Sequence, residues 1–212
     1  MIEGEDCVRM SGKIVFATGN AGKMKEIQMI MADTGLEVVS MKEAGISIDI
    51  EENGRTYEEN AMIKARAVAA QTKEIVMADD SGLEIDYLNK EPGIYSARYM
   101  GEDTPYSVKN ANLIKRLEGV LDEKRTARFV CAIAAVLPDG TELTTRATIE
   151  GRIDYTEKGS QGFGYDPILY VPQFGKTTAE LTEEEKNLVS HRGKALQLMK
   201  EELKKYENNN CQ

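Results

Sequence analysis

The sequence predicts an α/β fold in which strands alternate with helices before an antiparallel hairpin extends the sheet. Three patterns support this prediction. A β-branched run is followed by a glycine-containing turn and by apolar residues at helical spacing, two further apolar runs flank another helical segment, and a last pair of apolar runs surrounds Pro138-Asp-Gly140. We expect strands at residues 13–17, 36–40, 75–79, 129–137, 143–149 and 168–171.

The helical spacing of apolar residues also predicts the positions of the helices. The first begins near Met24 and ends at Thr34-Gly35, and the last opens with the capping-box pattern Thr182-Glu-Glu-Glu185. Two further helices are expected at residues 56–71 and 104–118. The residues expected to face the core are Val108, Leu113, Ile114 and Leu117 in the third helix and Leu188, Ala195, Met199 and Leu203 in the last.

A length of 212 residues fits one continuous domain, which we expect at residues 13–206. Residues 1–12 are expected to be an N-terminal extension, and residues 207–212 a polar tail that begins after Tyr206. Residues 82–103 are rich in Gly, Pro, Tyr and acids without a sustained period, so we expect a short strand and long loops there. Such loops often carry function.

The composition is that of an ordinary globular protein, with 41% hydrophobic and 30% charged residues. No apolar run approaches the roughly 18–20 residues that cross a bilayer, so we expect no membrane contact. The net charge of -9 argues against a nucleic-acid partner, because affinity for a phosphate backbone comes from clustered lysines and arginines. An anionic substrate would therefore need a local concentration of positive groups.

The cysteines and the single histidine restrict the kind of metal site. Cys7, Cys131 and Cys211 lie far apart and form no CxxC pair, which favours a reduced, cytoplasmic setting. His191 is the only histidine, so a zinc site built from Cys and His ligands is close to excluded. Any metal must be held by oxygen.

The segment Thr18-Gly-Asn-Ala-Gly-Lys23 joins the first strand to the first helix. Its glycines allow a ligand to approach the backbone, the free N–H groups at the helix start favour an anion, and Lys23 adds a positive charge. A triphosphate needs these features. The spacing differs from the common nucleotide-binding loop, and Met24 stands where that loop requires Ser or Thr, so a plain turn with a solvated lysine is the alternative.

The segment Ala78-Asp-Asp-Ser-Gly82 follows an apolar strand, which is expected to bring its acids to the carboxyl edge of the sheet. A carboxylate there can hold Mg²⁺ and accept a proton from an attacking water. Adjacent strand residues point to opposite sides, so either Asp79 or Asp80 could be structural. Ordinary turn chemistry at Asp-Ser-Gly is the alternative.

Glu51 and Glu52 precede the helix that carries Asn60 and Lys64. Either glutamate could complete an oxygen metal site, and Lys64 could contact a phosphate. In the structural alternative, the glutamates are solvated acids that stabilise the positive N-terminal end of this helix.

Two later segments, Gly162-Phe-Gly-Tyr-Asp-Pro167 and Ser190-His-Arg-Gly193, combine aromatic, acidic and basic side chains. An aromatic ring in a glycine-rich loop can stack on a base, Asp166 can accept base N–H groups, and His191 and Arg192 can donate to oxygens. Together the segments resemble a purine pocket. The alternatives are aromatic residues in the core and a histidine with a purely structural role.

Taken together, these segments resemble the inosine triphosphate pyrophosphatase family, also called non-canonical purine NTP pyrophosphatases or XTP/dITP diphosphatases. The resemblance covers about residues 13–203. It rests on six motifs that appear in the family's order: ATGNAGK, EENGRTYEENAMIKA, ADDSGLEID, PGIYSARYMGE, GFGYDPILYVP and KNLVSHRGKAL. It implies two α/β lobes on a long, mixed, twisted β-sheet flanked by helices, an active cleft between the lobes, and a homodimer.

The resemblance also implies a role for each segment. Glu51 and Asp80 would hold Mg²⁺, with Mn²⁺ as a possible substitute for the metal and Glu52 for Glu51. Asp80 would be the catalytic base for water. The implied substrate-binding residues are Thr18, Gly19, Asn20, Ala21, Gly22, Lys23, Lys64, Ser81, Phe163, Gly164, Tyr165, Asp166, Lys186, His191 and Arg192.

The activity that this resemblance implies is hydrolysis of ITP, dITP and XTP to a monophosphate and pyrophosphate, by attack of water at the α-phosphorus. Two other hypotheses are open. The same fold could act on modified pyrimidine or canonical triphosphates, which only a substrate panel decides. The chain could also bind nucleotides without turnover. However, a protein that only binds a polyanion gains little affinity from paired carboxylates unless they hold a metal.

Overall fold

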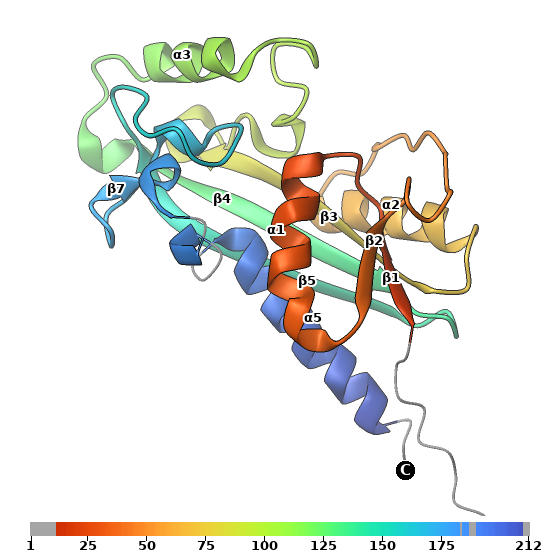
Figure 1. Ribbon diagram of the computed structural model, residues 1–212. Helices are drawn as coiled ribbons and strands as arrows, with labels where there is room; N and C mark the ends of the chain where they lie inside the picture. The colour runs from red at the N-terminus through yellow and green to blue at the C-terminus, as the bar shows by residue number, and fades with distance from the viewer. Residues whose placement is uncertain (1–11, 183, 187–189, 210–212) are drawn as a thin grey trace, which may run out of the picture.

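The computed structural model describes residues 12–182, 184–186 and 190–209. Within these residues the chain forms a seven-stranded mixed sheet with strand order β2-β1-β3-β4-β5-β6-β7 (Figure 1). β1 pairs in parallel with β2 and β3, and all later pairings are antiparallel. The strands are β1 Lys13–Phe16, β2 Glu37–Ser40, β3 Ile75–Ile85, β4 Thr126–Val136, β5 Glu142–Ile153, β6 Leu169–Val171 and β7 Lys176–Thr177.

The first three described α-helices match the predicted periodic segments. The α-helices are α1 Ala21–Met31, α2 Tyr57–Ala69, α3 Tyr106–Arg116 and α5 His191–Asn209. The short 3₁₀ helices are η1 Ala32–Thr34, η2 Asp86–Leu88, η3 Gly93–Tyr95, η4 Asp122–Lys124, η5 Asp166–Ile168 and η6 Thr178–Glu180.

Helices cover both faces of the sheet. On one face, α1 and α5 lie side by side, and their residues Ile27 and Met199 share a buried cluster with Phe16 of β1 (Figure 1). On the other face, α2 buries Ala61 and Ala65 against alternate residues of β1, β3 and β4. Successive side chains of a strand point to opposite faces, so each of these strands contributes to both clusters.

A separate hydrophobic cluster lies toward the far end of the long strands. There, Leu83 and Ile85 of β3 pack with Leu113 of α3 and with Ile168 and Leu169 near β6. The predicted mixed α/β fold is confirmed. The two-lobed division that we expect is compatible with cores at both ends of β3 to β5, and it stays a prediction.

β3 is longer than the sequence pattern indicates. We expected this strand to stop at Asp79, with turn chemistry at Asp-Ser-Gly as an alternative, but β3 continues to Ile85 and pairs with β4 over its whole second half. The backbone ladder with β4 therefore overrides the turn propensity of Asp-Ser-Gly. As a result, Asp80 lies in the middle of a paired strand, beyond the point where β1 ends.

The final helix also differs from the expectation. Residues 184–186 are helical and the Thr182–Glu185 capping box forms, but Ser190 is a bend and α5 begins at His191. The Ser190 hydroxyl accepts a hydrogen bond from the N–H of Gly193 and so caps the new helix. α5 continues to Asn209, beyond the expected start of the tail at residue 207. Leu188, residues 1–11 and residues 210–212 lie outside the described residues.

The prediction of which α3 residues face the core is partly wrong. Leu113 and Leu117 are buried as predicted, whereas the Val108 side chain is exposed. Lys109 and Asn110 are buried instead, because they donate hydrogen bonds to the backbone carbonyls of two loops below α3. Polar contacts therefore set the rotation of this helix.

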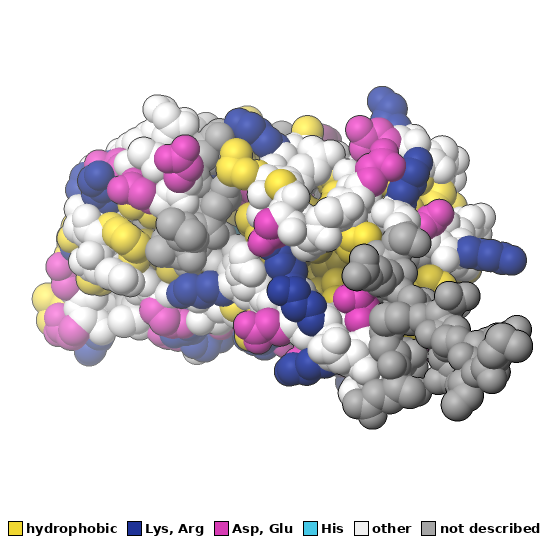
Figure 2. All heavy atoms as spheres, turned by 60° about the horizontal axis from the view of Figure 1, so that its bottom comes forward, with side chains coloured by type: hydrophobic (Ala, Val, Ile, Leu, Met, Phe, Trp, Pro, Cys, Tyr) yellow, Lys and Arg dark blue, Asp and Glu magenta, His cyan; other side chains and the backbone are white. Residues whose placement is uncertain are grey.

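None of the described helices is long and apolar enough to span a membrane. On the face shown in Figure 2, basic and acidic side chains alternate without forming a large area of one sign. This face offers no basic surface of the kind that binds a phosphate backbone.

Gly82 should be required for the fold, because β3 meets the η3 loop there. A Cβ at Gly82 would lie 2.3 Å from the carbonyl oxygen of Gly93, whereas a Cβ at Gly19 would have no neighbour within 4 Å. We expect Gly82→Ala to lower the free energy of unfolding by about 1–3 kcal/mol. Gly19→Ala is the matched control and should leave it nearly unchanged. Urea denaturation of both variants measures the difference, and equal stabilities would contradict this account.

Candidate functional site

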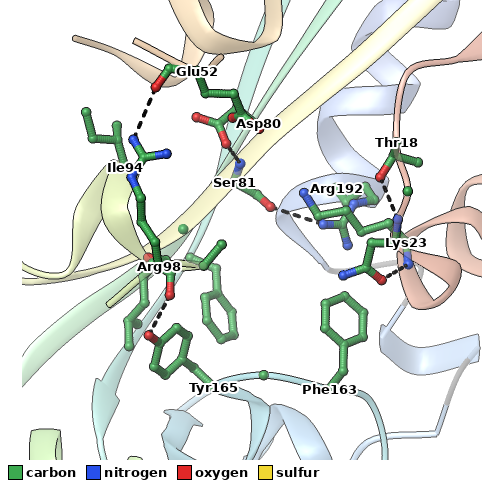
Figure 3. Close-up of a pocket in the computed structure, with 18 of the residues that line it drawn as sticks. Thr18, Lys23, Glu52, Asp80, Ser81, Ile94, Arg98, Phe163, Tyr165 and Arg192 are labelled. Carbon is green, nitrogen blue, oxygen red and sulfur yellow. Dashed lines mark hydrogen bonds between the residues drawn. The ribbon is translucent and has the colours of Figure 1, made fainter. Parts of the chain in front are cut away.

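One cavity of about 390 Å³ brings together residues from both halves of the chain (Figure 3). It lies where the β1–α1 turn, the middle of β3, the loop after η3 and the start of α5 meet. Most of the predicted substrate-binding residues line it. These are Thr18, Gly19, Asn20, Lys23, Lys64, Ser81, Phe163, Gly164, Tyr165, Asp166, Lys186, His191 and Arg192, together with Asp80.

The β1–α1 turn places the start of α1 at this cavity. The Asn20 side chain caps α1 by accepting a hydrogen bond from the N–H of Lys23 at 3.1 Å, and Thr18 Oγ1 accepts one from the N–H of Asn20. Ala21 and Gly22 do not line this cavity. They belong to the first turn of α1, and Gly22 instead faces a neighbouring cavity of about 220 Å³ on the other side of Phe163.

The two adjacent aspartates of β3 point to opposite faces of the sheet, as the alternation predicted. Asp79 faces α1 and α5, where its Oδ2 atom lies 2.9 Å from Lys23 Nζ and 3.2 Å from Arg192 Nη2. Burial alone would raise the pKa of Asp79, but these two cations hold it well below its usual range. Asp79 is therefore a buried, charged partner for two basic side chains and has a structural role.

Asp80 faces α2 and the cavity. Its Oδ2 atom accepts a hydrogen bond from Asn60 Nδ2 at 3.1 Å, and its Oδ1 atom lies 3.9 Å from Lys64 Nζ. Burial raises the pKa of Asp80 to about 6, although Lys64 and Lys23 act in the opposite direction. The carboxylate thus has fewer compensating charges than Asp79 has, and it is open to a further cation or to a proton.

The structure distinguishes between the two candidate glutamates. Glu52 lines the cavity, and its Oε2 atom lies 2.9 Å from Lys64 Nζ. Glu51 is exposed and is not part of the cavity lining, because consecutive residues of this extended segment point in different directions. Of the two alternatives, Glu52 is the one whose carboxylate approaches Asp80 and Lys64.

Glu26 of α1 is a site residue that the sequence patterns did not indicate. Its carboxylate contacts Lys186 Nζ at 2.9 Å and the guanidinium of Arg192. Both cations are buried and both lie beside the Phe163 ring. Glu26 follows Lys23 by three positions on a helix, so it shares a face with it, and that spacing is the signal that could have found it.

The loop around Phe163 is fixed by Asp166. Asp166 Oδ2 accepts hydrogen bonds from the N–H of Phe163 at 2.8 Å and from Lys186 at 2.7 Å, and Oδ1 accepts one from Thr178. Gly162 is required here, because a Cβ at this position would lie 2.2 Å from Asp166 Oδ2. Both oxygens of Asp166 are thus engaged, so its structural task is to hold the loop that presents Phe163.

His191 is buried at the start of α5 and lines the cavity. Its ring packs on Phe129 with centroids 5.0 Å apart, and its Nδ1 atom has no hydrogen-bond partner among the described residues. Burial, together with the charges of Arg192 and Lys186, holds the pKa of His191 well below its usual value. The histidine is therefore a neutral ring with an unsatisfied polar atom beside the cavity.

Tyr165, expected in the pocket, lines the cavity mainly as a packing residue. It is buried, its hydroxyl donates to the carbonyl of Ser96 at 2.8 Å, and its ring meets Tyr106 edge-on. Several further lining residues were not predicted, among them Phe129, Arg98 and Tyr106. They come from a strand, a loop and a helix start, and only the folded chain brings them together.

Comparisons with known proteins agree with the resemblance drawn from the motifs. A family model described as the Ham1 family matches residues 14–202. The chain is 47% identical over 198 residues to a dITP/XTP pyrophosphatase of Clostridium perfringens, covering 91% of this chain and 97% of that protein. It is 50% identical over 199 residues to a protein of the same name from Caldanaerobacter subterraneus subsp. tengcongensis. That match covers 93% of this chain and 99% of that protein.

Solved structures give the same result. The structure of the Staphylococcus aureus Ham1 protein superposes with a TM-score of 0.82 at 41% identity and covers 92% of this chain and 99% of that one. A HAM1 protein from Coxiella burnetii superposes with a TM-score of 0.82 at 39% identity and covers 93% of this chain and 100% of that one. From its sequence, its motifs and its fold, this chain belongs to the Ham1 family.

Proposed function

We propose that this protein hydrolyses non-canonical purine nucleoside triphosphates such as dITP, XTP and ITP to the monophosphate and pyrophosphate. The observation that carries the proposal is the position of Asp80, a buried carboxylate with a raised pKa that lies against a cavity lined by Lys23 and Lys64. The relatives named dITP/XTP pyrophosphatase support the same substrate class.

The residues of the cavity divide into those for the phosphates and those for the proton. The positive end of the α1 dipole, together with Lys23 and Lys64, would bind the triphosphate. Asp80 would accept a proton from a water molecule that attacks the α-phosphorus. Asn60 would keep the carboxylate oriented for this step, because it donates a hydrogen bond to one of its oxygens.

The donor set fits Mg²⁺, with Mn²⁺ as a possible substitute. Lys64 Nζ lies 2.9 Å from Glu52 and 3.9 Å from Asp80, so these two carboxylates already converge on one cation. No group of three or more potential His, Cys, Asp or Glu ligands occurs among the described residues. Two carboxylates completed by substrate oxygens and water are the usual arrangement for Mg²⁺. When bound, the ion would neutralise charge on the leaving pyrophosphate.

The opposite part of the cavity suits a purine base. Phe163 offers an aromatic face, and the neutral His191 can offer an N–H group to a carbonyl oxygen at C6. Adenine carries an amino donor at this position and would leave such a group unpaired, which a buried site rejects strongly. Arg192 and Lys186 would act mainly through their field, because their nitrogens already contact Asp79, Glu26 and Asp166.

The homodimer and the cytoplasmic location follow from the family resemblance and from the cysteine pattern, respectively. Both stay predictions, and size-exclusion chromatography with light scattering would measure the first.

The reaction class is tested by its products. With Mg²⁺ present, we expect dITP, XTP and ITP to give the monophosphate and pyrophosphate, with GTP, ATP and pyrimidine triphosphates turned over much more slowly. Separation of nucleotides by anion-exchange chromatography, with a pyrophosphate assay, measures both products. Formation of diphosphates and orthophosphate would refute attack at the α-phosphorus, and binding without turnover would favour a regulatory protein.

Asp80→Asn should reduce turnover by roughly 100-fold or more, because a positioned general base contributes on that scale. The amide keeps the size of the side chain and can still accept a hydrogen bond from Asn60, so the fold should persist. Steady-state kinetics with dITP, together with the thermal unfolding midpoint, separates the two effects. Retained activity would remove Asp80 from the role of base.

The choice between the two glutamates can be tested with a matched pair of variants. Glu52→Gln should raise the Mg²⁺ concentration needed for half-maximal rate on the order of tenfold or more, the scale seen when support of a metal site is lost. Glu51→Gln should leave it unchanged, because Glu51 is exposed outside the cavity. The same titration with Mn²⁺ tests the expected substitution. The reverse result would restore Glu51 as the ligand.

A further inference from the structure

One face of α3 contacts residues 162–166, the loop that carries Phe163, although α3 lies outside the six sequence motifs. Tyr106 and Asn110 lie one turn apart on this face. The Tyr106 ring meets the Tyr165 ring edge-on, with centroids 5.1 Å apart, and a Cβ added at Gly164 would lie 3.5 Å from it. The Asn110 side chain is buried and donates a hydrogen bond to the Gly164 carbonyl at 3.3 Å. Two side chains of α3 therefore hold the same short stretch of this loop.

The Asn110 amide group meets only acceptors. Its Nδ2 atom donates to Glu157 Oε1 at 2.6 Å as well as to the Gly164 carbonyl, so the side chain must turn its NH₂ group toward them. The amide oxygen Oδ1 is left buried, with no hydrogen-bond partner among the described residues. A buried acceptor without a partner destabilises a fold, so stability alone does not account for an asparagine at this position.

Asn110 gives Phe163 a second backbone anchor. The first is the hydrogen bond from the N–H of Phe163 to Asp166 Oδ2 at 2.8 Å. On the other side of Phe163, Gly164 has a φ of 68° in the left-handed region, and its carbonyl is the group that Asn110 holds. The backbone is thus fixed before and after Phe163, whose side chain extends toward Arg192 in Figure 3. The second anchor is uncharged and comes from α3, so it is independent of the charged contacts around Asp166.

We propose that Asn110 is a positioning residue for the nucleobase, which orients the aromatic face of Phe163 through the Gly164 carbonyl. The inference rests on the proposed function, in which the base of the substrate lies against Phe163. Asn110 does not line the cavity, so it would act only through the loop. Lys23 and Lys64, the side chains proposed for the phosphates, belong to α1 and α2 and not to this loop. The effect of Asn110 should therefore be confined to ligands that carry a base.

The test compares a ligand that has a base with one that has none, by isothermal titration calorimetry. Asn110→Asp keeps the shape of the side chain but replaces the NH₂ donor with an acceptor, and Asn110→Leu removes the donor without adding a charge. For both variants we expect the dissociation constant of inosine monophosphate to rise about fivefold or more, the lower end of the effect of stacking a base on an aromatic ring. The dissociation constant of tripolyphosphate with Mg²⁺ should change less than about twofold in Asn110→Leu.

Asn112→Asp is the matched control on the same helix. Asn112 uses its oxygen to accept a hydrogen bond from the Tyr99 hydroxyl at 2.8 Å, and an aspartate can still accept it. This variant adds the same charge to α3 as Asn110→Asp, and it should leave the affinity for inosine monophosphate unchanged within about twofold. Thermal unfolding midpoints establish that each variant is folded at the temperature of the titration.

Four outcomes would overturn the role of Asn110. These are unchanged affinity for inosine monophosphate in both Asn110 variants, an equal loss for both ligands in Asn110→Leu, an equal loss for inosine monophosphate in Asn112→Asp, and a wild-type protein that binds tripolyphosphate but not inosine monophosphate. The binding measurements need no turnover. The proposed function fails separately, if the wild-type protein does not convert dITP to monophosphate and pyrophosphate.

Discussion

The pairing of Asp79 with Lys23 and Arg192 is the interaction on which the rest of the site depends. These residues come from β3, α1 and α5, three elements far apart in the sequence, and the two cations lie 2.9 and 3.2 Å from the Asp79 carboxylate. Removing one partner of a buried ion pair leaves an uncompensated charge, which costs about 3–5 kcal/mol. The pairing therefore fixes both helix starts against the middle of the sheet.

The same network continues from Arg192 to the base end of the cavity. Arg192 contacts Glu26, Glu26 contacts Lys186, and Lys186 contacts Asp166, so positive and negative groups alternate along the chain of contacts. Asp166 also accepts a hydrogen bond from the N–H of Phe163. The position of the aromatic ring therefore depends on a network of charged contacts that starts at Asp79 of β3. The acids of this network lower the net positive charge of the cavity, although an anion is the proposed ligand. The network therefore holds its cations in place, and the basic residues with fewer acidic partners are the ones available to bind phosphate.

Much of this arrangement could be predicted from the sequence, since it follows from local patterns. The alternation of side chains along a strand separated Asp79 from Asp80, and the glycines and lysine of the turn before α1 indicated that the start of α1 would line the site. The length of β3 could not be predicted, because pairing with β4 decides it. Glu26 and Arg98 were missed for a related reason. A charged residue on a helix or loop has no distinct local pattern, and its partners are set only when distant elements meet.

The extension of β3 past the end of β1 explains how one site can combine precise and adaptable parts. Asp80 is opposite Ala132 in the β4 ladder, so its backbone belongs to the most continuous part of the sheet. Catalytic groups need placement to within about half an ångström, and sites on strands or helices meet that demand better than sites on loops. Of the residues proposed for phosphate and base, Lys23, Lys64 and His191 belong to helices, whereas Phe163 lies in a loop. A shift of the Phe163 loop would therefore alter the space for a base, while the carboxylate proposed to accept the proton would keep its place.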